Sequence, residues 1–270
     1  MKPTRLTASL REKIWGATAL GPWFPDSREK IGEVWFVSDG KPLPILIKFI
    51  FTSGHLSVQV HPDDEYARIH EGSPGKTEMW HILRADPGAT IAVGLRSEIS
   101  SERLREAAIS GEIESLLNWI RVSPGDTIFT APGTIHAIGA GVALCEIQQQ
   151  SDVTYRLYDY GRPRELHLDR AIAVARPGLH PGKSVPVRLS ATEERLAACP
   201  HFVTDRIQVC VGLRYQPDPA RTHFLIILEG AGRLAGEPCR AGEAWLVPPG
   251  ADPFAIEPEN AFSLLRTYVP

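Results

Sequence analysis

Turn signals interrupt this sequence at short intervals, and their spacing limits what the chain can fold into. Glycine and proline contribute 23 residues each to a chain of 270. They stand between apolar runs along the whole length, so low complexity does not explain them. Such spacing favours many short strands joined by tight turns. We therefore predict a mainly β fold, a barrel or sandwich, rather than βαβ units.

The apolar runs themselves show where the strands should lie. Residues 44–51 are branched and aromatic apart from Pro44 and Lys48, which predicts a buried strand, and residues 56–60 alternate like a half-buried one. Helical patterns are confined to residues 63–70 and 101–117, the second with a break near Gly111. Further strands are predicted at 77–83, 90–95, 126–129, 135–138, 142–149, 153–158, 202–211, 224–228, 232–234 and 244–247.

A turn-rich segment divides the chain. Residues 176–189 contain closely spaced prolines and glycines and are typical of a linker. We predict one barrel over residues 1–175 and a smaller one over residues 190–270. Similar turn patterns at 123–133 and 240–250 suggest that the two halves repeat one unit.

Composition excludes several classes of partner. The chain has 29 Lys and Arg against 32 Asp and Glu, a net charge of −3, so no basic surface for nucleic acid or anionic lipid is expected. No apolar segment is long enough to span a bilayer, and the N-terminus does not resemble a signal peptide. The four cysteines lack CxxC spacing and are expected to be reduced thiols in a cytoplasmic protein.

Four dispersed side chains form a candidate metal site. Gln59 and His61 are two residues apart and leave the same face of one predicted strand, while Glu78 and His136 follow on others. Adjacent barrel strands can bring them together, and mixed nitrogen and oxygen donors suit zinc. The alternative is that these are unrelated polar side chains, since nine histidines are scattered over the chain.

Other charged residues lie within apolar strands. Lys48 either meets an anion in a pocket or lies along the barrel wall with its ammonium in water. Arg156 either points inward, where its planar fork suits a phosphate or an oxyanion, or is an exposed strand residue. Glu146, if buried, would have a raised pKa and could act as a general base. Lys76 shares the face of Glu78 if the strand has begun there.

Several motifs occur together and in a fixed order. Residues 56–64, 75–80, 132–138 and 146–156 strongly resemble motifs of the type I mannose-6-phosphate isomerases, in their short bacterial form, and residues 13–16, 32–35 and 164–168 are similar to further segments of that family. Several long motifs in order are more specific than any one of them. The resemblance is close over residues 10–175 and looser beyond.

The resemblance implies a fold, a cofactor and roles for individual residues. It implies a cupin-type double β-barrel that binds one Zn²⁺ through Gln59, His61, Glu78 and His136. It gives catalytic roles to Arg156 as the active-site arginine, to Glu146 as a proton-transfer group and to Lys76. It gives substrate-binding roles to Lys48, Ser57 and again Arg156, with the two lysines and the serine lining the pocket. The second half has no matching ligand set, so a second metal is not expected. Residues 51–55 and His81 depart from the usual family pattern.

The implied activity is the interconversion of mannose 6-phosphate and fructose 6-phosphate through an enediol or enediolate. The implied partner is thus a small-molecule sugar phosphate, with the chain a monomer or a homodimer. One alternative is a catalytically silent cupin that binds a sugar phosphate as a sensor or scaffold. Another is a metal-dependent oxygenase, which Gln59 in place of a histidine disfavours.

Overall fold

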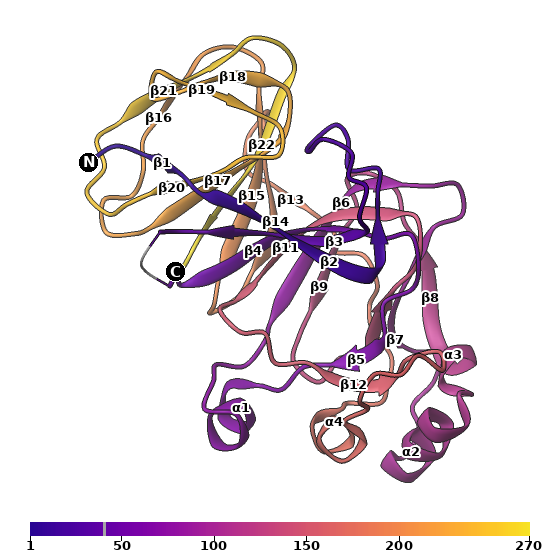
Figure 1. Cartoon of the computed structure of the whole chain (residues 1–270). Helices are drawn as coiled ribbons and strands as arrows, with labels where there is room; N and C mark the ends of the chain where they lie inside the picture. The colour runs from indigo at the N-terminus through magenta and orange to yellow at the C-terminus, as the bar shows by residue number, and fades with distance from the viewer. Residues whose placement is uncertain (40–41) are drawn as a thin grey trace.

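The alternating apolar runs form antiparallel strands, as the turn spacing predicts. The structure is a computed structural model that describes residues 1–39 and 42–270. Within those residues there are 22 strands and four helices, and every strand pair is antiparallel. The predicted mainly β fold class is confirmed, and the sheets have the cupin-type arrangement (Figure 1).

Two sheets from the first part of the chain enclose the predicted site residues. The six-stranded sheet contains, in spatial order, β2 (Thr7–Ala17), β3 (Ile31–Val37), β4 (Ile45–Phe51), β11 (Val142–Gln149), β6 (Glu78–Ala85) and β9 (Thr127–Thr130). The five-stranded sheet contains β12 (Tyr155–Tyr158), β5 (Val58–Val60), β10 (His136–Ile138), β7 (Thr90–Leu95) and β8 (Leu117–Arg121).

The second part of the chain forms two more sheets. The seven-stranded sheet contains β1 (Thr4–Arg5), β20 (Ala244–Val247), β17 (His223–Glu229), β22 (Phe262–Tyr268), β15 (Val203–Val209), β14 (Glu193–Ala198) and β13 (Val187–Arg188). The four-stranded sheet contains β16 (Leu213–Tyr215), β21 (Phe254–Pro258), β18 (Ala231–Leu234) and β19 (Glu237–Arg240). Because β1 comes from the start of the chain and β13 lies within residues 176–189, the division into two domains stays a prediction.

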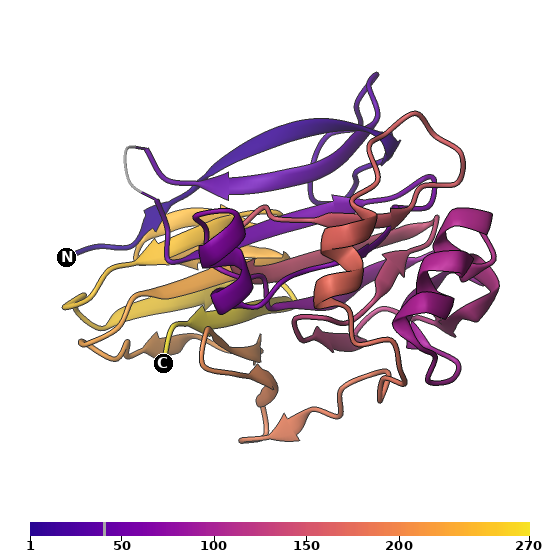
Figure 2. The ribbon, with the colours of Figure 1, turned by 90° about the horizontal axis from the view of Figure 1, so that it is seen from below.

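The helices gather at the end of the molecule farthest from the C-terminal strands (Figures 1 and 2). They are α1 (Asp64–His70), α2 (Ser101–Ser110), α3 (Ile113–Leu116) and α4 (Leu168–Val174). The predicted break at Gly111 is confirmed, since this residue ends α2 with φ 81°. The prediction of helix through Leu117 is wrong, because Leu117 is extended and pairs with Leu95 in β7. Among the described residues, no helix has the length and apolar character needed to cross a bilayer.

Strand β4 is buried on both faces and separates the core from the site. Ile47 and Phe49 pack into a core cluster that the six-stranded and seven-stranded sheets share, together with Phe202 and Phe224. Lys48 lies between them in sequence and therefore points to the opposite face. The alternation along β4 thus places one charged side chain toward the inside of the barrel formed by the first two sheets.

Shortening a core side chain of β4 should affect stability. We expect Ile47→Val to lower the free energy of unfolding by about 0.5–1.5 kcal/mol, because Ile47 is fully buried and the change deletes one methylene. Urea denaturation of the two proteins measures the difference. An unchanged midpoint would show that the core around β4 is not closely packed.

Candidate functional site

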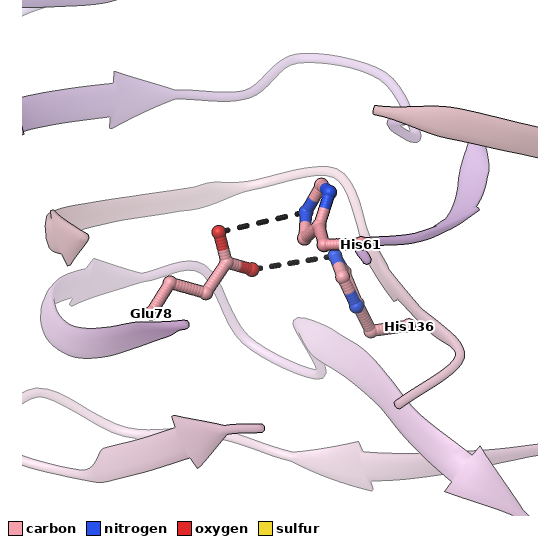
Figure 3. Close-up of side chains that lie close together, drawn as sticks. All are labelled: His61, Glu78 and His136. Atoms are coloured by element: carbon pink, nitrogen blue, oxygen red, sulfur yellow. Dashed lines mark ion pairs between the residues drawn. The ribbon is translucent and has the colours of Figure 1, made fainter. Parts of the chain in front are cut away.

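Three of the four predicted metal ligands converge inside the barrel (Figure 3). His61 directly follows β5, and Glu78 and His136 begin β6 and β10. His61 Nε2 lies 3.6 Å from Glu78 Oε2, and His136 Nε2 lies 3.3 Å from Glu78 Oε1. The three side chains are almost completely buried, and their ligand atoms all lie within 4.8 Å of one another. This is a compact, buried donor set.

Hydrogen bonds to the backbone fix the orientation of both imidazole rings. His61 Nδ1 lies 2.9 Å from the carbonyl oxygen of Val153, and His136 Nδ1 lies 2.9 Å from that of Thr134. A carbonyl can only accept, so each Nδ1 carries the proton and each Nε2 presents a lone pair toward Glu78. Among the described residues, neither Nε2 has a hydrogen-bond partner. Buried lone pairs without a donor fit a metal ion, so the cluster can hold one.

The charge states also suit a cation. Burial lowers the pKa of His61 to about 3, and burial likewise lowers the pKa of His136, so both rings are neutral at physiological pH. Burial alone would raise the pKa of Glu78, but the ammonium of Lys76 outweighs it and holds that pKa well below its usual range. The cluster therefore offers two neutral imidazoles and one carboxylate, which is the deprotonated form that metals bind.

The fourth predicted ligand lies beside this cluster. Gln59 in β5 is paired directly with His136 in β10 on one side and with Arg156 in β12 on the other. Directly paired residues place their side chains on the same face of a sheet, so the amide of Gln59 shares the face of His136. Gln59 is only half-buried and lines a cavity of about 330 Å³.

That cavity also brings together the other predicted site residues. Lys48, Ser57, Lys76, Glu146 and Arg156 all line it. Lys76 precedes β6 rather than belonging to it, but its ammonium still lies 3.1 Å from Glu78 Oε2. Although burial opposes it, the nearby carboxylate of Glu78 raises the pKa of Lys76, so this side chain stays an ammonium ion.

Lys48 and Glu146 form a buried ion pair across neighbouring strands. They are directly paired between β4 and β11, and Lys48 Nζ lies 3.1 Å from Glu146 Oε1. Trp80 Nε1 donates a hydrogen bond of 3.0 Å to the other oxygen of Glu146. Burial raises the pKa of Glu146 although the ammonium of Lys48 opposes the shift. The structure thus supports the prediction that Lys48 meets an anion in a pocket, rather than the alternative in which its ammonium lies in water.

Several cavity residues received no role from the sequence. They include two cations, two carboxylates and a histidine: Lys13, Arg164, Glu33, Asp152 and His167. Four of them lie in residues 13–16, 32–35 and 164–168, which the sequence identifies only as segments similar to the family. With these included, five Lys and Arg side chains and three carboxylates line the cavity, so it favours an anionic ligand.

Comparison with known proteins identifies the family. The chain is 34% identical to a mannose-6-phosphate isomerase of Streptococcus mutans, with 86% of this chain and 87% of the relative aligned. It is 33% identical to a mannose-6-phosphate isomerase of Bacillus subtilis, over 92% of this chain and 93% of the relative. The chain belongs to the mannose-6-phosphate isomerase family. No family model matches it.

Solved structures agree with this assignment. The crystal structure of the mannose 6-phosphate isomerase from Bacillus subtilis superposes with a TM-score of 0.88 at 28% identity and covers 99% of both chains. A putative mannosephosphate isomerase from Archaeoglobus fulgidus has a TM-score of 0.79 at 19% identity, a likeness of fold. The family is one of aldose–ketose isomerases, so the chain is an enzyme, and its cavity and the cluster of His61, Glu78 and His136 lie in the first barrel.

Proposed function

We propose that this chain is a zinc-dependent isomerase that interconverts mannose 6-phosphate and fructose 6-phosphate through an enediol or enediolate. The observation that carries the proposal is the buried cluster of His61, Glu78 and His136 next to a cavity in which Lys and Arg side chains outnumber carboxylates. The reaction needs stabilisation of the negative charge that develops on the enediolate oxygens, and its substrate carries a phosphate. A metal ion at this cluster and the cations of the cavity would supply these two interactions in one region of the barrel.

The cofactor in this proposal is one zinc ion held by His61, Glu78 and His136, with the amide oxygen of Gln59 as the fourth ligand. Mixed nitrogen and oxygen donors and neutral imidazoles suit zinc. When bound, the ion would act as a Lewis acid on the carbonyl and hydroxyl oxygens of the substrate.

Proton transfer is assigned to Glu146. The reaction removes a proton from C2 of the open-chain aldose and returns one to C1. Burial raises the pKa of Glu146, which makes its carboxylate a stronger base than an exposed one. The Lys48 ammonium, 3.1 Å away, keeps the carboxylate in place.

The remaining residues bind the substrate and stabilise charge. Arg156 supplies a permanent positive charge for the enediolate or the phosphate. Because its raised pKa keeps it protonated, Lys76 acts as a fixed cation and hydrogen-bond donor rather than as a base. Lys48 and Ser57 contact the substrate from the cavity wall.

A coupled assay tests the activity. Purified protein loaded with zinc is given mannose 6-phosphate. Coupling enzymes convert the fructose 6-phosphate that forms and then oxidise the product with NADP⁺, and the NADPH that appears is followed. We expect turnover that depends on protein concentration. Binding of mannose 6-phosphate without any turnover would instead favour the silent sugar-phosphate-binding cupin.

The role of Glu146 predicts a pH dependence. A carboxylate accepts a proton only when ionised, so activity should be present above the pKa of Glu146 and be lost as the pH falls through it. Burial raises this pKa, so we expect the acid limb of kcat to lie above the usual glutamate value of about 4.3. The profile is measured with the metal content determined at each pH. A kcat that stays constant down to that value with full metal content would contradict the assignment.

A further inference from the structure

One buried carboxylate in the loop after β12 holds two arginines. Asp159 is 2% exposed. Arg164 donates from Nε to Oδ2 and from Nη2 to Oδ1, both at 2.6 Å. Arg162 donates from Nε and Nη2 to Oδ1 at 3.1 and 2.5 Å. Hydrogen bonds between charged groups are short and directional, so Asp159 fixes the position of both guanidinium groups.

The two arginines differ in the groups that surround the part of each guanidinium that does not contact Asp159. Arg162 donates from Nη1 to the carbonyl oxygen of His55 at 2.9 Å, and its guanidinium lies 5.3 Å from the ring centre of Tyr160. Arg162 is not among the cavity-lining residues, whereas Arg164 is. Within the described part of the chain, Nη1 of Arg164 has no hydrogen-bond partner. One edge of Arg164 is therefore available to a ligand in the cavity.

At this end of the cavity, guanidinium groups outnumber the carboxylates that pair with them directly. Arg156 also lines it and has no carboxylate within ion-pair distance among the described residues; its Nη1 donates to the carbonyl oxygen of Glu165 at 3.3 Å. Asp159 carries one negative charge against the two positive charges of Arg162 and Arg164. Two guanidinium groups facing one cavity suit a phosphate dianion, whose oxygens match their planar forks.

The lysines of the cavity are placed differently. The ammonium of Lys48 lies 3.1 Å from Glu146, and that of Lys76 lies 3.1 Å from Glu78. Each is already paired with a buried carboxylate, so neither supplies uncompensated charge. A phosphate group would gain more from the arginines than from these lysines.

We propose that Arg164 is a substrate-binding residue that takes the phosphate group together with Arg156, and that Asp159 is a positioning residue that holds Arg164 in place. The identity of the substrate rests on the proposed function, but the phosphate subsite itself does not. The reacting carbons would then lie toward Gln59 and Glu146, and the phosphate toward the loop of residues 159–165.

Arg164→Ala and Arg162→Ala form a matched pair for the test, because each removes one of the two partners of Asp159. We expect Arg164→Ala to raise KM for mannose 6-phosphate about 10- to 100-fold, the loss of a charge-assisted contact, with little change in kcat. Arg164→Lys should recover part of the affinity, because it restores the charge without the fork. Arg162→Ala should leave KM within about twofold of the wild type, since Arg162 does not face the cavity.

The positioning role has its own measurement. Asp159→Asn keeps Arg164 but removes the negative charge that holds its guanidinium in place. We therefore expect KM to rise while kcat is retained. A purely structural role would lower thermal stability in Asp159→Asn and Arg162→Ala alike without a selective change in KM. Equal effects of Arg162→Ala and Arg164→Ala on KM would overturn the proposal.

Inorganic phosphate provides a probe that does not need turnover. Calorimetric titration should show phosphate binding to the wild type that weakens about 10-fold or more in Arg164→Ala. If the wild type fails to isomerise mannose 6-phosphate but binds phosphate in an Arg164-dependent way, the proposed function fails and the subsite stands. If the wild type is active and Arg164→Ala and Arg164→Lys match it in KM and in phosphate affinity, the subsite is wrong and the function stands.

Discussion

His136→Ala is expected to remove the bound metal and to reduce turnover of mannose 6-phosphate by at least about a thousandfold, since Lewis-acid stabilisation is worth several kcal/mol. His136 is fully buried and presents its Nε2 lone pair 3.3 Å from Glu78. Without it, the cluster retains one imidazole and one carboxylate beside the ammonium of Lys76. Metal content by mass spectrometry and kcat by the coupled assay are measured on the same preparation.

His81 offers a matched control. It is also a buried histidine, but its Nδ1 lies 3.0 Å from Thr127 Oγ1, and it is not part of the cluster of His61, Glu78 and His136. We expect His81→Gln to keep its metal and most of its activity. His136→Gln preserves more volume if the alanine variant does not fold. A folded His136 variant with full activity and no metal would refute the assignment of His136 as a ligand.

Glu146→Gln is expected to lower kcat by about 10²- to 10⁴-fold, the usual contribution of a positioned general base. The amide has nearly the same shape and keeps an oxygen that can accept the hydrogen bond from Trp80, but it cannot accept the proton. KM should change less than kcat, because the substitution leaves the cations of the cavity in place. The metal content should remain that of the wild type.

Asp152 is a second carboxylate near Lys48, the lysine that pairs with Glu146. A variant at Asp152 therefore shows whether the loss of a negative charge near Lys48 is enough to lower kcat. Asp152 Oδ1 lies 3.9 Å from Lys48 Nζ, and its side chain is 70% exposed. Because Asp152 is largely exposed and its contact with Lys48 is long, solvent screens the interaction, so Asp152→Asn should change kcat by no more than about fivefold. If Asp152→Asn and Glu146→Gln reduce kcat equally, Glu146 is not the proton-transfer group.

The sequence allowed the site to be predicted where local patterns determine which way a side chain points. The alternation of residues 45–51 places Lys48 opposite Ile47, and the spacing of Gln59 and His61 puts both on one face. The order of the motifs then linked these strands to Glu78 and His136. Their roles as zinc ligands stay predictions. The structure does bring His61, Glu78 and His136 close together.

Other features depended on contacts distant in sequence. Strands β2 and β3 were not predicted; β2 mixes exposed and buried residues without regular alternation. The arginine pair at Asp159 was missed because nothing in the residues 159–164 indicates that the aspartate is buried. The pairing of β1 with β20 joins Thr4 to Leu246, which are 242 positions apart, and no local pattern contains that information.

The central claim is that Gln59, His61, Glu78 and His136 hold a zinc ion on which the isomerisation depends. The most direct measurement follows two quantities in the wild-type protein, its zinc content and its turnover of mannose 6-phosphate. Both are measured on the untreated protein, on protein from which a chelator has removed the metal and has then itself been removed, and on that protein after zinc is added back. We expect one zinc per chain, loss of turnover when the metal is removed, and recovery of turnover when zinc is restored. Full turnover by folded protein without metal would contradict it.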